Sequence, residues 1–295
     1  METTRAGFVA VVGRPNAGKS TLLNHLVGEK LAMVSQKAQA TRKRMKIIVH
    51  HRQAQIVFVD TPGLHEKEKL LNRFMLDEAL KAIGDSDAIL FLAPVTDTTA
   101  EYERFLERVT DSKRPHIVLL TKIDQVPPAQ LLQRIRDYQP FQEHFEALIP
   151  FSVKKGGSKE QLLDAVAALL PEHPWLYDPD LLTTENIRDI YRELIREAIY
   201  ANLSDEIPYE SDVLIDRIDE RPEIDRVYAT IVVEKPTQKG MMVGRDGGTI
   251  RRLGRDARRR MEQFAARQIH LDLHVSVKKG WSKHRKGLED LGYLF

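Results

Sequence analysis

The stretch Gly13-Arg14-Pro15-Asn16-Ala17-Gly18-Lys19-Ser20 fits the phosphate-binding pattern G-x-x-x-x-G-K-[ST]. An apolar run at residues 8–12 precedes it and predicts a buried strand, and residues 21–26 follow with the spacing of a helix. Such a loop surrounds a polyphosphate with backbone N–H groups at a helix N-terminus. We expect Lys19 to reach the terminal phosphates, Ser20 to ligate Mg²⁺ and Thr21 to lie beside the phosphates. The chain is therefore predicted to bind a nucleoside triphosphate.

The composition indicates a folded protein of about two domains, because 295 residues exceed the usual size of one core. Apolar residues make up 42% and charged residues 30%, as is ordinary for a soluble globular chain. No run approaches the roughly 20 apolar residues that span a bilayer, and residues 1–4 lack a signal-peptide pattern. The absence of cysteine excludes disulfides and cysteine-ligated metals. We therefore expect a cytoplasmic protein.

Charge is distributed unevenly, although the whole chain carries only +2. Residues 235–290 carry a net charge of +9, and the remainder carries −7. A basic C-terminal part on an acidic body suggests a polyanionic partner for that part alone. A solvated basic helix face is the other interpretation, and charge alone does not decide between them.

Strand-like and helical runs alternate from residue 8 to about residue 170. Short apolar runs at residues 56–59, 88–92, 117–120 and 147–151 are separated by helical stretches at residues 72–83, 100–110 and 161–170. This alternation predicts an α/β fold with a mostly parallel sheet, which binds ligands beyond the carboxyl ends of its strands. Three prolines between residues 171 and 179 end the last helix. Beyond them we expect a helix, two strands, a helix–turn–helix and a last strand.

Three further motifs follow predicted strands. Asp60-Thr61-Pro62-Gly63 follows residues 56–59, so Asp60 can hold the magnesium shell and the Gly63 N–H can contact a γ-phosphate. Thr121-Lys122-Ile123-Asp124 follows residues 117–120, and Asp124 can accept hydrogen bonds from two guanine donors, where adenine presents the opposite pattern. Phe151-Ser152-Val153-Lys154 would close over the base. Four motifs in this order predict GTP as the ligand.

Residues 7–154 resemble a small GTPase domain of the translation-factor-related class, and the bacterial Era family of ribosome-assembly GTPases is the closest match. The resemblance rests on Gly13-Arg14-Pro15-Asn16, on Gln39-Ala40-Thr41-Arg42 and on Asp60-Thr61-Pro62-Gly63-Leu64-His65. It implies that the Thr41 hydroxyl completes the magnesium shell in the GTP state, and that Thr61, Pro62 and Leu64 belong to the second switch. It also implies that an Asn16 oxygen helps to hold K⁺; the alternative is that Asn16 only stabilises the loop turn.

Three positions depart from the family pattern: Thr121 stands where Asn is usual, Val153 where Ala is usual, and Ala40 where Thr is usual. Thr121 lacks the amide that braces the base loop, which predicts modest nucleotide affinity. Leu64 occupies the position of the glutamine that orients the attacking water in many GTPases. Because a leucine side chain makes no hydrogen bonds, intrinsic hydrolysis is predicted to be slow.

Gly244-Arg245-Asp246-Gly247 lies between two predicted helices. The order helix–strand–strand–helix–GxxG–helix–strand resembles a type II KH domain, in which the glycines let the backbone approach about four nucleotides of single-stranded RNA. The expected RNA-binding residues are Gly244, Arg245, Asp246, Gly247, Thr249, Ile250, Arg251, Arg252, Lys278, Lys279 and Trp281, within the field of Arg255, Arg258, Arg259 and Arg260. Trp281 either stacks on a base or packs under the tail at residues 291–293.

The resemblance to Era covers nearly the whole chain. It implies a GTPase domain at residues 1–172, a linker at 173–183, a smaller α+β type II KH domain at 184–280 and a tail at 281–295. Era-like function implies GTP and GDP as ligands, and assistance of small ribosomal subunit (30S) assembly by binding 16S rRNA near its 3′ end. No obligate oligomer is expected. The resemblance also implies peripheral contact with the inner face of the cell membrane, although the sequence holds no clear amphipathic anchor.

Two other functions fit part of this pattern. One is an RNA-binding scaffold whose nucleotide is mainly structural, which Leu64 favours. The other is a tRNA-modifying GTPase, which shares the Asn16-type phosphate loop but which the GxxG module disfavours. Single-turnover hydrolysis with and without RNA distinguishes an enzyme from a scaffold.

Overall fold

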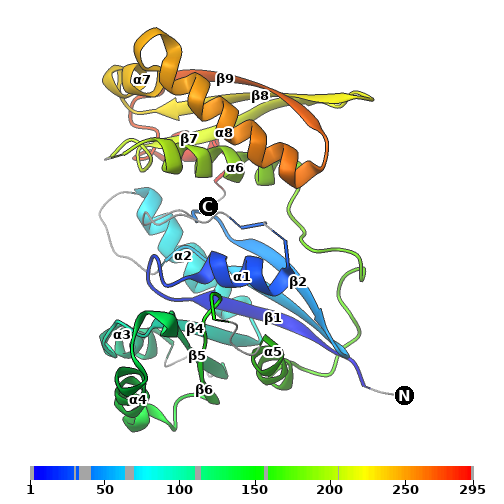
Figure 1. The fold of residues 1–295 in the computed structure, drawn as a ribbon, viewed down its shortest axis with the longest axis vertical. Coiled ribbons are helices and arrows are strands. Elements are labelled where there is room, and N and C mark those ends of the chain that lie inside the picture. Colours follow the sequence, from blue (N-terminus) through cyan, green and yellow to red (C-terminus); the bar gives the residue numbers. More distant parts are fainter. Residues whose placement is uncertain are drawn as a thin grey trace. The chain divides into compact units, whose positions relative to one another are not determined.

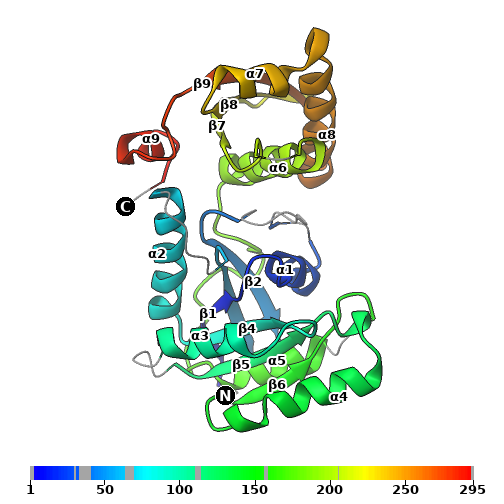
Figure 2. The ribbon, with the colours of Figure 1, turned by 90° about the vertical axis from the view of Figure 1, so that its left-hand side faces the viewer.

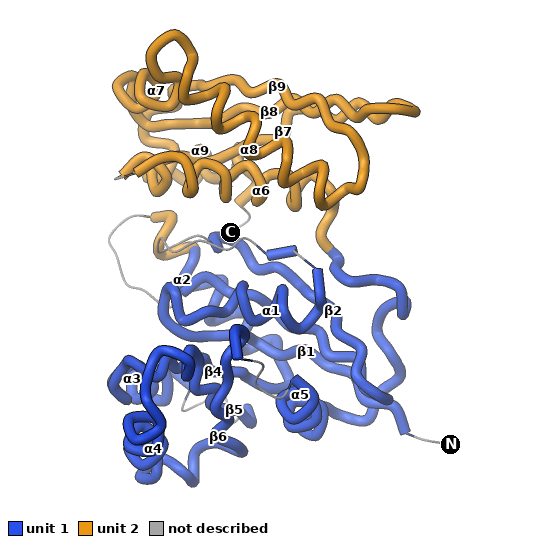
Figure 3. Tube along the Cα trace, in the orientation of Figure 1, with its two compact units in different colours: residues 1–32, 41–65, 75–184 blue, residues 33–40, 66–74, 185–295 orange. Residues whose placement is uncertain are grey.

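The computed structural model describes residues 3–29, 31–32, 41–63, 70–109, 114–155, 159–204 and 206–293. The chain forms two compact units (Figure 3). Residues 1–32, 41–65 and 75–184 form the first unit, and residues 33–40, 66–74 and 185–295 form the second. Four residues of the predicted switches, Gln39, Ala40, Leu64 and His65, fall outside the described residues.

The first unit is built on a six-stranded sheet in the order β2-β3-β1-β4-β5-β6 (Figure 1). Its strands are β1 (Arg5–Val12), β2 (Met45–His51), β3 (Ala54–Asp60), β4 (Ala88–Pro94), β5 (His116–Thr121) and β6 (Ala147–Pro150). Neighbouring strands pair in parallel, except that β2 is antiparallel to β3. The strands are almost continuously apolar because both faces of a parallel sheet are covered. The predicted α/β fold with a mostly parallel sheet is confirmed.

The helices of this unit are α1 (Lys19–Val27), α2 (Leu70–Asp85, whose first turn belongs to the second unit), α3 (Ala100–Val109), α4 (Pro128–Asp137) and α5 (Lys159–Ala168). Figure 2 shows α1 and the rest of α2 on opposite faces of the sheet. Tyr102 and Phe105 of α3 pack in one apolar cluster with Phe91 of β4. None of the helices in the described ranges has the length and apolar character needed to span a bilayer.

The segment after α5 is fastened to the sheet of the first unit. The buried side chain of Gln55 accepts a hydrogen bond from the Leu176 N–H (2.7 Å) and donates one to the Tyr177 carbonyl (2.8 Å). Further on, the Ile48 N–H donates to the Leu182 carbonyl at 2.8 Å. Residues 176–182 therefore pack on the sheet of the first unit.

The second unit is a three-stranded sheet with helices packed on it. Its strands are β7 (Ser211–Asp219), β8 (Ile224–Val233) and β9 (Gln268–Val277), in the order β7-β8-β9, with β8 antiparallel to β7 and parallel to β9. Its helices are α6 (Ile187–Asn202), α7 (Pro236–Val243), α8 (Gly248–Ala265) and α9 (Arg285–Glu289). Ile195, Ile231 and Leu253, from α6, β8 and α8, share one buried core. The predicted order of a type II KH domain is confirmed.

Candidate functional site

The phosphate loop, residues 13–20, leaves the end of β1 and enters α1 in a backbone shape that requires glycine. Gly13 has a φ of 149°, and a Cβ there would lie 2.7 Å from the Leu92 carbonyl oxygen. Gly18, at a φ of 103°, precedes the first helical residue, Lys19. Asn16 also has a positive φ, of 62°. Glycine lowers the free-energy cost of these conformations, which turn the loop around the N-terminus of α1.

Lys19 is buried inside this loop, where its Nζ donates to the carbonyls of Gly13 (2.9 Å) and Arg14 (3.2 Å). Burial lowers the pKa of Lys19 to about 8, and the nearby Asp60 carboxylate only partly opposes this shift. An ammonium group enclosed by a loop at a helix N-terminus favours a polyanion there. The arrangement can therefore hold the terminal phosphates of a nucleotide.

Three oxygen-bearing side chains converge beside Lys19. The Ser20 hydroxyl donates to Asp60 Oδ2 at 2.9 Å, the Thr41 hydroxyl donates to the same oxygen at 3.3 Å, and the two hydroxyls lie 3.2 Å apart. Hydroxyl and carboxylate oxygens are the hard donors that Mg²⁺ prefers when phosphates and water complete its shell. The described residues hold no cluster of three or more histidine, cysteine, aspartate or glutamate side chains that could bind a metal alone. The cluster of Ser20, Thr41 and Asp60 therefore fits a nucleotide-bound Mg²⁺.

The segment after Asp60 lies against the phosphate loop. The Thr61 hydroxyl donates to the Val11 carbonyl of β1 at 2.7 Å. Two residues on, past Pro62, a Cβ on Gly63 would lie 2.7 Å from the backbone and side chain of Pro15. Such a contact leaves room for glycine only, and it brings the Gly63 backbone beside the expected phosphates. The next residue, Leu64, is outside the described residues.

The predicted base-binding residues come together at the ends of β5 and β6. Ser152 donates to Asp124 Oδ1 at 2.7 Å, and this hydrogen bond is the main cause that lowers the pKa of Asp124. Lys122 donates from Nζ to the Asn16 carbonyl at 2.6 Å, so the base loop and the phosphate loop are joined. The Ser152 hydroxyl also accepts the Lys154 N–H at 3.2 Å, across the turn that begins at Val153. An ionised Asp124 held in this way can accept the guanine donors.

An ion pair that was not predicted from the sequence fixes the phosphate loop from the side of β4. Arg14 and Asp97 form a two-pronged ion pair, with Arg14 Nη2 2.8 Å from Asp97 Oδ1 and a second contact from Nε to Oδ2. The hydrogen bond to Asp97 is the main cause that raises the pKa of Arg14. Asp97 lies in the loop between β4 and α3, and no local pattern in the sequence marks it as a partner of Arg14.

In the second unit, the GxxG loop joins α7 to α8 through a backbone with positive φ. Gly244 has a φ of 73° and Gly247 a φ of 75°, and Asp246 between them has a φ of 51°. A Cβ on Gly244 would lie 2.2 Å from the Thr249 hydroxyl. The Arg251 guanidinium donates to the Asp246 carbonyl and so folds back on the loop. Arg245 and Asp246 are exposed, so the loop presents backbone and charge to a ligand.

Beside this loop, a groove of about 300 Å³ runs between α8 and β9. One wall carries the cations Arg251, Arg255 and Arg258, which the helical spacing of four and three residues puts on one face of α8. The groove is also lined by Ile250, Gly254, His270, Leu271 and Leu273. Apolar surface beside a row of arginines suits the bases and phosphates of a single strand. The helix side of this groove was predicted from the sequence, whereas its β9 side was not.

Not every predicted RNA-binding residue lines this groove. The Arg252 guanidinium contacts Asn202 of α6, with Nε 3.2 Å from the Asn202 Oδ1. Lys278 and Lys279 are exposed at the end of β9, and Lys278 pairs with Asp290. The stacking role predicted for Trp281 is wrong, because its side chain is only 1% exposed and donates from Nε1 to the Glu210 carbonyl (3.4 Å). Packing within the C-terminal segment was the other interpretation of this residue.

Comparisons with known proteins identify the domain that carries each candidate site. Residues 8–122 match the family model of the 50S ribosome-binding GTPase, and residues 195–282 match that of the KH domain. The chain is 48% identical over 296 residues to GTPase Era of Helicobacter pylori (strain ATCC 700392 / 26695), covering 99% of this chain and 97% of the relative. The chain belongs to the Era family of GTPases. GTPase Era of Campylobacter concisus (strain 13826) is 47% identical over 98% of this chain and 100% of the relative.

Two solved Era structures align over almost the full length. Each has a TM-score of 0.94 and 29% identity, and covers 99% of this chain and 100% of the other. One is a single-residue variant of Aquifex aeolicus Era bound to GDP·AlF₄⁻, and the other is Era in complex with MgGDPNP and nucleotides 1506–1542 of 16S ribosomal RNA. The predicted Era resemblance and the predicted order of a GTPase domain and a KH domain are therefore confirmed.

Proposed function

We propose that this chain is a GTP-hydrolysing, RNA-binding protein that assists assembly of the small ribosomal subunit (30S) by binding 16S rRNA near its 3′ end. One observation carries the proposal: the same chain holds two candidate sites. One is a phosphate loop whose Ser20 meets Thr41 and Asp60, and the other is a GxxG loop beside a cationic groove. The Era structure that contains MgGDPNP and a 16S rRNA segment supports this combination of ligands.

In the nucleotide site, each residue would have a separate role. Residues 13–21 would surround the phosphates with N–H groups, and Lys19 would offset their charge. Ser20, Thr41 and Asp60 would hold Mg²⁺, which supplies two further positive charges at the phosphates. Asp124 would select guanine, and residues 152–154 would close over the base. A Cβ on Gly63 would lie 2.7 Å from Pro15, so the Gly63 backbone runs close to the phosphate loop, which supports a place for the Gly63 N–H at the γ-phosphate.

Hydrolysis would be slow in the protein alone. Leu64 has no group that could orient a water molecule, and none of the other residues predicted for the site is a convincing catalytic base. Charge that develops between the β- and γ-phosphates still needs stabilisation. An Asn16 oxygen would help to hold K⁺ at this place. The positive φ of Asn16 and the hydrogen bond from Lys122 to its carbonyl support a fixed position for this residue.

In the RNA site, residues 244–247 would hold the backbone of about four nucleotides, with Thr249, Ile250 and Arg251 beside them and Lys278 and Lys279 adding charge. GTP would order Thr41 and residues 60–65 and favour an RNA-binding arrangement, and hydrolysis would reset it. The GTPase domain would span residues 1–172 and the KH domain 184–280, with residues 173–183 as linker and 281–295 as tail. A role on the 30S subunit implies a cytoplasmic location, and peripheral membrane contact stays a prediction.

Single-turnover hydrolysis of GTP tests this function, measured with and without an RNA of nucleotides 1506–1542 of 16S rRNA. We expect slow hydrolysis of GTP, none of ATP, and tight binding of the RNA in the presence of a non-hydrolysable GTP analogue. An RNA-binding protein that hydrolyses no GTP under either condition would be the scaffold instead. A protein that hydrolyses GTP but prefers tRNA to the rRNA segment would belong with the tRNA-modifying GTPases.

A further inference from the structure

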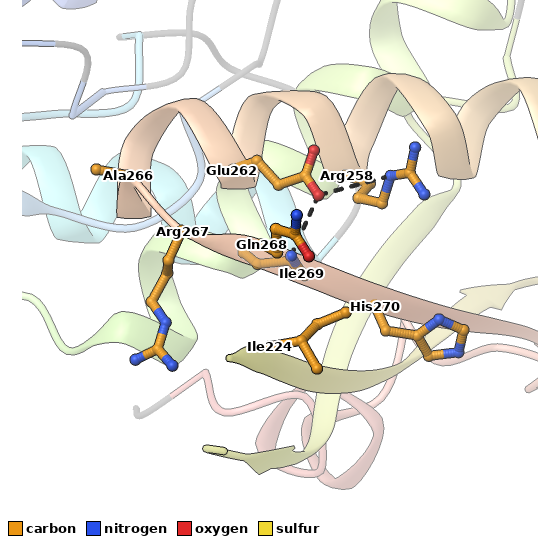
Figure 4. Close-up of a pocket in the computed structure, with 8 residues that line it drawn as sticks. All are labelled: Ile224, Arg258, Glu262, Ala266, Arg267, Gln268, Ile269 and His270. Carbon is orange, nitrogen blue, oxygen red and sulfur yellow. Dashed lines mark hydrogen bonds and ion pairs between the residues drawn. The ribbon is translucent and has the colours of Figure 1, made fainter. Parts of the chain in front are cut away.

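The groove beside the GxxG loop continues beyond its far end. Arg258 and His270, which line the groove, also line a second hollow of about 620 Å³ at the C-terminal end of α8 (Figure 4). The other residues that line this second hollow are Ile224, Glu262, Ala266, Arg267, Gln268 and Ile269. Because two side chains line both, the groove and the second hollow adjoin each other along α8 and β9.

The charges of the second hollow differ from those of the groove. Among the described residues, the groove is lined by three arginines and no carboxylate, whereas the second hollow is lined by Arg258, Arg267 and the carboxylate of Glu262. Arg267 is held in place by an ion pair with Asp225 (3.1 Å) and by a hydrogen bond to the Arg221 carbonyl (2.6 Å). Glu262 lies between the two guanidinium groups in the view of Figure 4.

Glu262 is held by contacts that involve one of its two oxygens. Glu262 Oε1 accepts the backbone N–H of Ile269 at 3.1 Å and lies 3.9 Å from Arg258 Nε. The side chain remains 34% exposed. The contacts described for Glu262 do not involve Oε2, so this oxygen can accept a hydrogen bond from a ligand in the hollow.

A carboxylate in the path of an RNA strand repels phosphates, because like charges at short range disfavour binding. It attracts the donor groups of bases instead, and carboxylates accept hydrogen bonds from the exocyclic amino group of cytosine. The amino groups of adenine and guanine offer the same kind of donor. Uracil has no amino group, and its one ring donor, N3–H, lies between two carbonyl oxygens that repel a carboxylate. A base with an amino group is thus the part of the RNA that fits beside Glu262, and the flanking arginines fit the neighbouring phosphates.

We propose that the second hollow binds one further nucleotide of the single strand, outside the four held at the GxxG loop, and that Glu262 selects a base with an exocyclic amino group there. This inference rests on the proposed RNA binding by the KH groove. It adds a base-specific contact at the C-terminal end of α8, away from the GxxG loop.

A uridine scan tests the proposal in the full-length protein. The probes are single-stranded RNA pieces of the segment 1506–1542 of 16S rRNA, shortened to the smallest piece that keeps full affinity, with uridine placed at each position in turn. At one position outside the four-nucleotide unit, uridine should weaken binding to the wild-type protein about tenfold. Fluorescence anisotropy at constant salt gives the affinities.

The variant Glu262→Gln keeps an oxygen that can accept the Ile269 N–H. It also adds an amide N–H group, which can donate a hydrogen bond to a carbonyl oxygen of uracil. The penalty at that one position should fall below about threefold in this variant, while the penalties at other positions stay unchanged. Glu289→Gln, which removes the same charge from α9 outside both hollows, should keep the full penalty. Thermal unfolding confirms that both variants are folded.

An equal uridine penalty in the wild type and Glu262→Gln would overturn the proposal, as would a scan without any sensitive position outside the four-nucleotide unit. Failure of the proposed function looks different. In that case the wild type binds none of the RNA pieces, or binds them equally well after Gly247→Asp, and the inference about Glu262 is then wrong as well.

Discussion

The Thr121 hydroxyl donates a hydrogen bond of 2.9 Å to the Ala17 carbonyl, which ties the end of β5 to the phosphate loop. Both residues are buried. Thr121 stands where the family usually has asparagine, and from this position its hydroxyl braces the phosphate loop. Thr121→Val should leave the Ala17 carbonyl buried without this donor, at a cost of about 1–3 kcal/mol in the free energy of unfolding. GDP affinity, measured by fluorescence titration, should fall with it.

Thr121→Ser is the matched control because it keeps the hydroxyl and removes only a methyl group. It should retain most of the stability and of the GDP affinity. If Thr121→Val behaves as the wild type in both denaturant unfolding and GDP binding, the hydrogen bond to Ala17 does not support the loop.

Asp124→Asn should change the choice of base. The amide can pair with a carbonyl of xanthine, so preference should move from GTP towards XTP, and GTP affinity should fall by two or more decades. Competition against a labelled nucleotide measures both. Ser152→Ala removes the hydrogen bond that lowers the pKa of Asp124. This variant should bind GTP with lower affinity without changing the preferred base. Equal affinities of the unmodified protein for GTP and ATP would refute the role of Asp124.

RNA binding should depend on the charge of the GxxG loop. Gly247→Asp brings a carboxylate against the RNA backbone and should lower the affinity by two or more decades. Because Gly247 has a φ of 75°, this change also strains the loop. Arg245→Asp adds a carboxylate at an exposed residue of the same loop without replacing a glycine, and it should weaken binding too. If both variants fold and bind RNA as tightly as the wild type does, the GxxG loop is not part of the RNA-binding site.

Hydrolysis of GTP should be faster in KCl than in NaCl at equal ionic strength, and Asn16→Ala should abolish the difference. Alanine is strained at the φ of 62° found here, so Asn16→Gly serves as a second variant that removes the side chain without this strain. Both variants should give equal rates in the two salts. Equal rates for the wild type, with GTP saturating, would show that K⁺ has no role.

His116 should make stability depend on pH. Burial lowers its pKa from 6.5 to about 4, and its Nε2 lies 2.7 Å from the Tyr102 hydroxyl. Below pH 6.5 the unfolded chain takes up a proton that the folded chain refuses, so the free energy of unfolding should fall between pH 6.5 and 4, by up to about 3 kcal/mol. Urea unfolding at several pH values measures it. His116→Gln should flatten this part of the profile, and an identical profile would contradict the assignment.

Most of the fold could be predicted from the sequence, because long apolar runs and glycine loops are local signals. The strand β2 and the helix α4 were not expected. In β2 the apolar core is only Ile47, Ile48 and Val49, between a lysine and two histidines, so no clear strand pattern stands out. In α4 no side chain is fully buried, and Leu131 and Ile135 are only partly buried where they pack against the core of the first unit. Both depend on tertiary contacts that a local pattern does not contain.

The described residues predicted for the nucleotide site come together because each motif follows a strand that ends at the same edge of the sheet, and their roles stay predictions. The ion pair of Asp97 and the β9 side of the groove beside the GxxG loop were not predicted, because their partners are distant in the sequence. Trp281 was misjudged for a related reason: a tryptophan beside two lysines looks exposed, and its burial depends on the fold of the tail.

The close approach of Thr249 to Gly244 limits which mutations this protein can accept. A Cβ at position 244 would lie 2.2 Å from the Thr249 hydroxyl and 2.9 Å from the Thr249 backbone nitrogen, so no second change at position 249 could relieve the clash. At Gly248 an added Cβ would meet no described atom within 4 Å. A random library selected for RNA binding should therefore recover only glycine at position 244 and many residues at 248. We therefore expect purifying selection to keep glycine at position 244, because no change at position 249 could compensate for its loss.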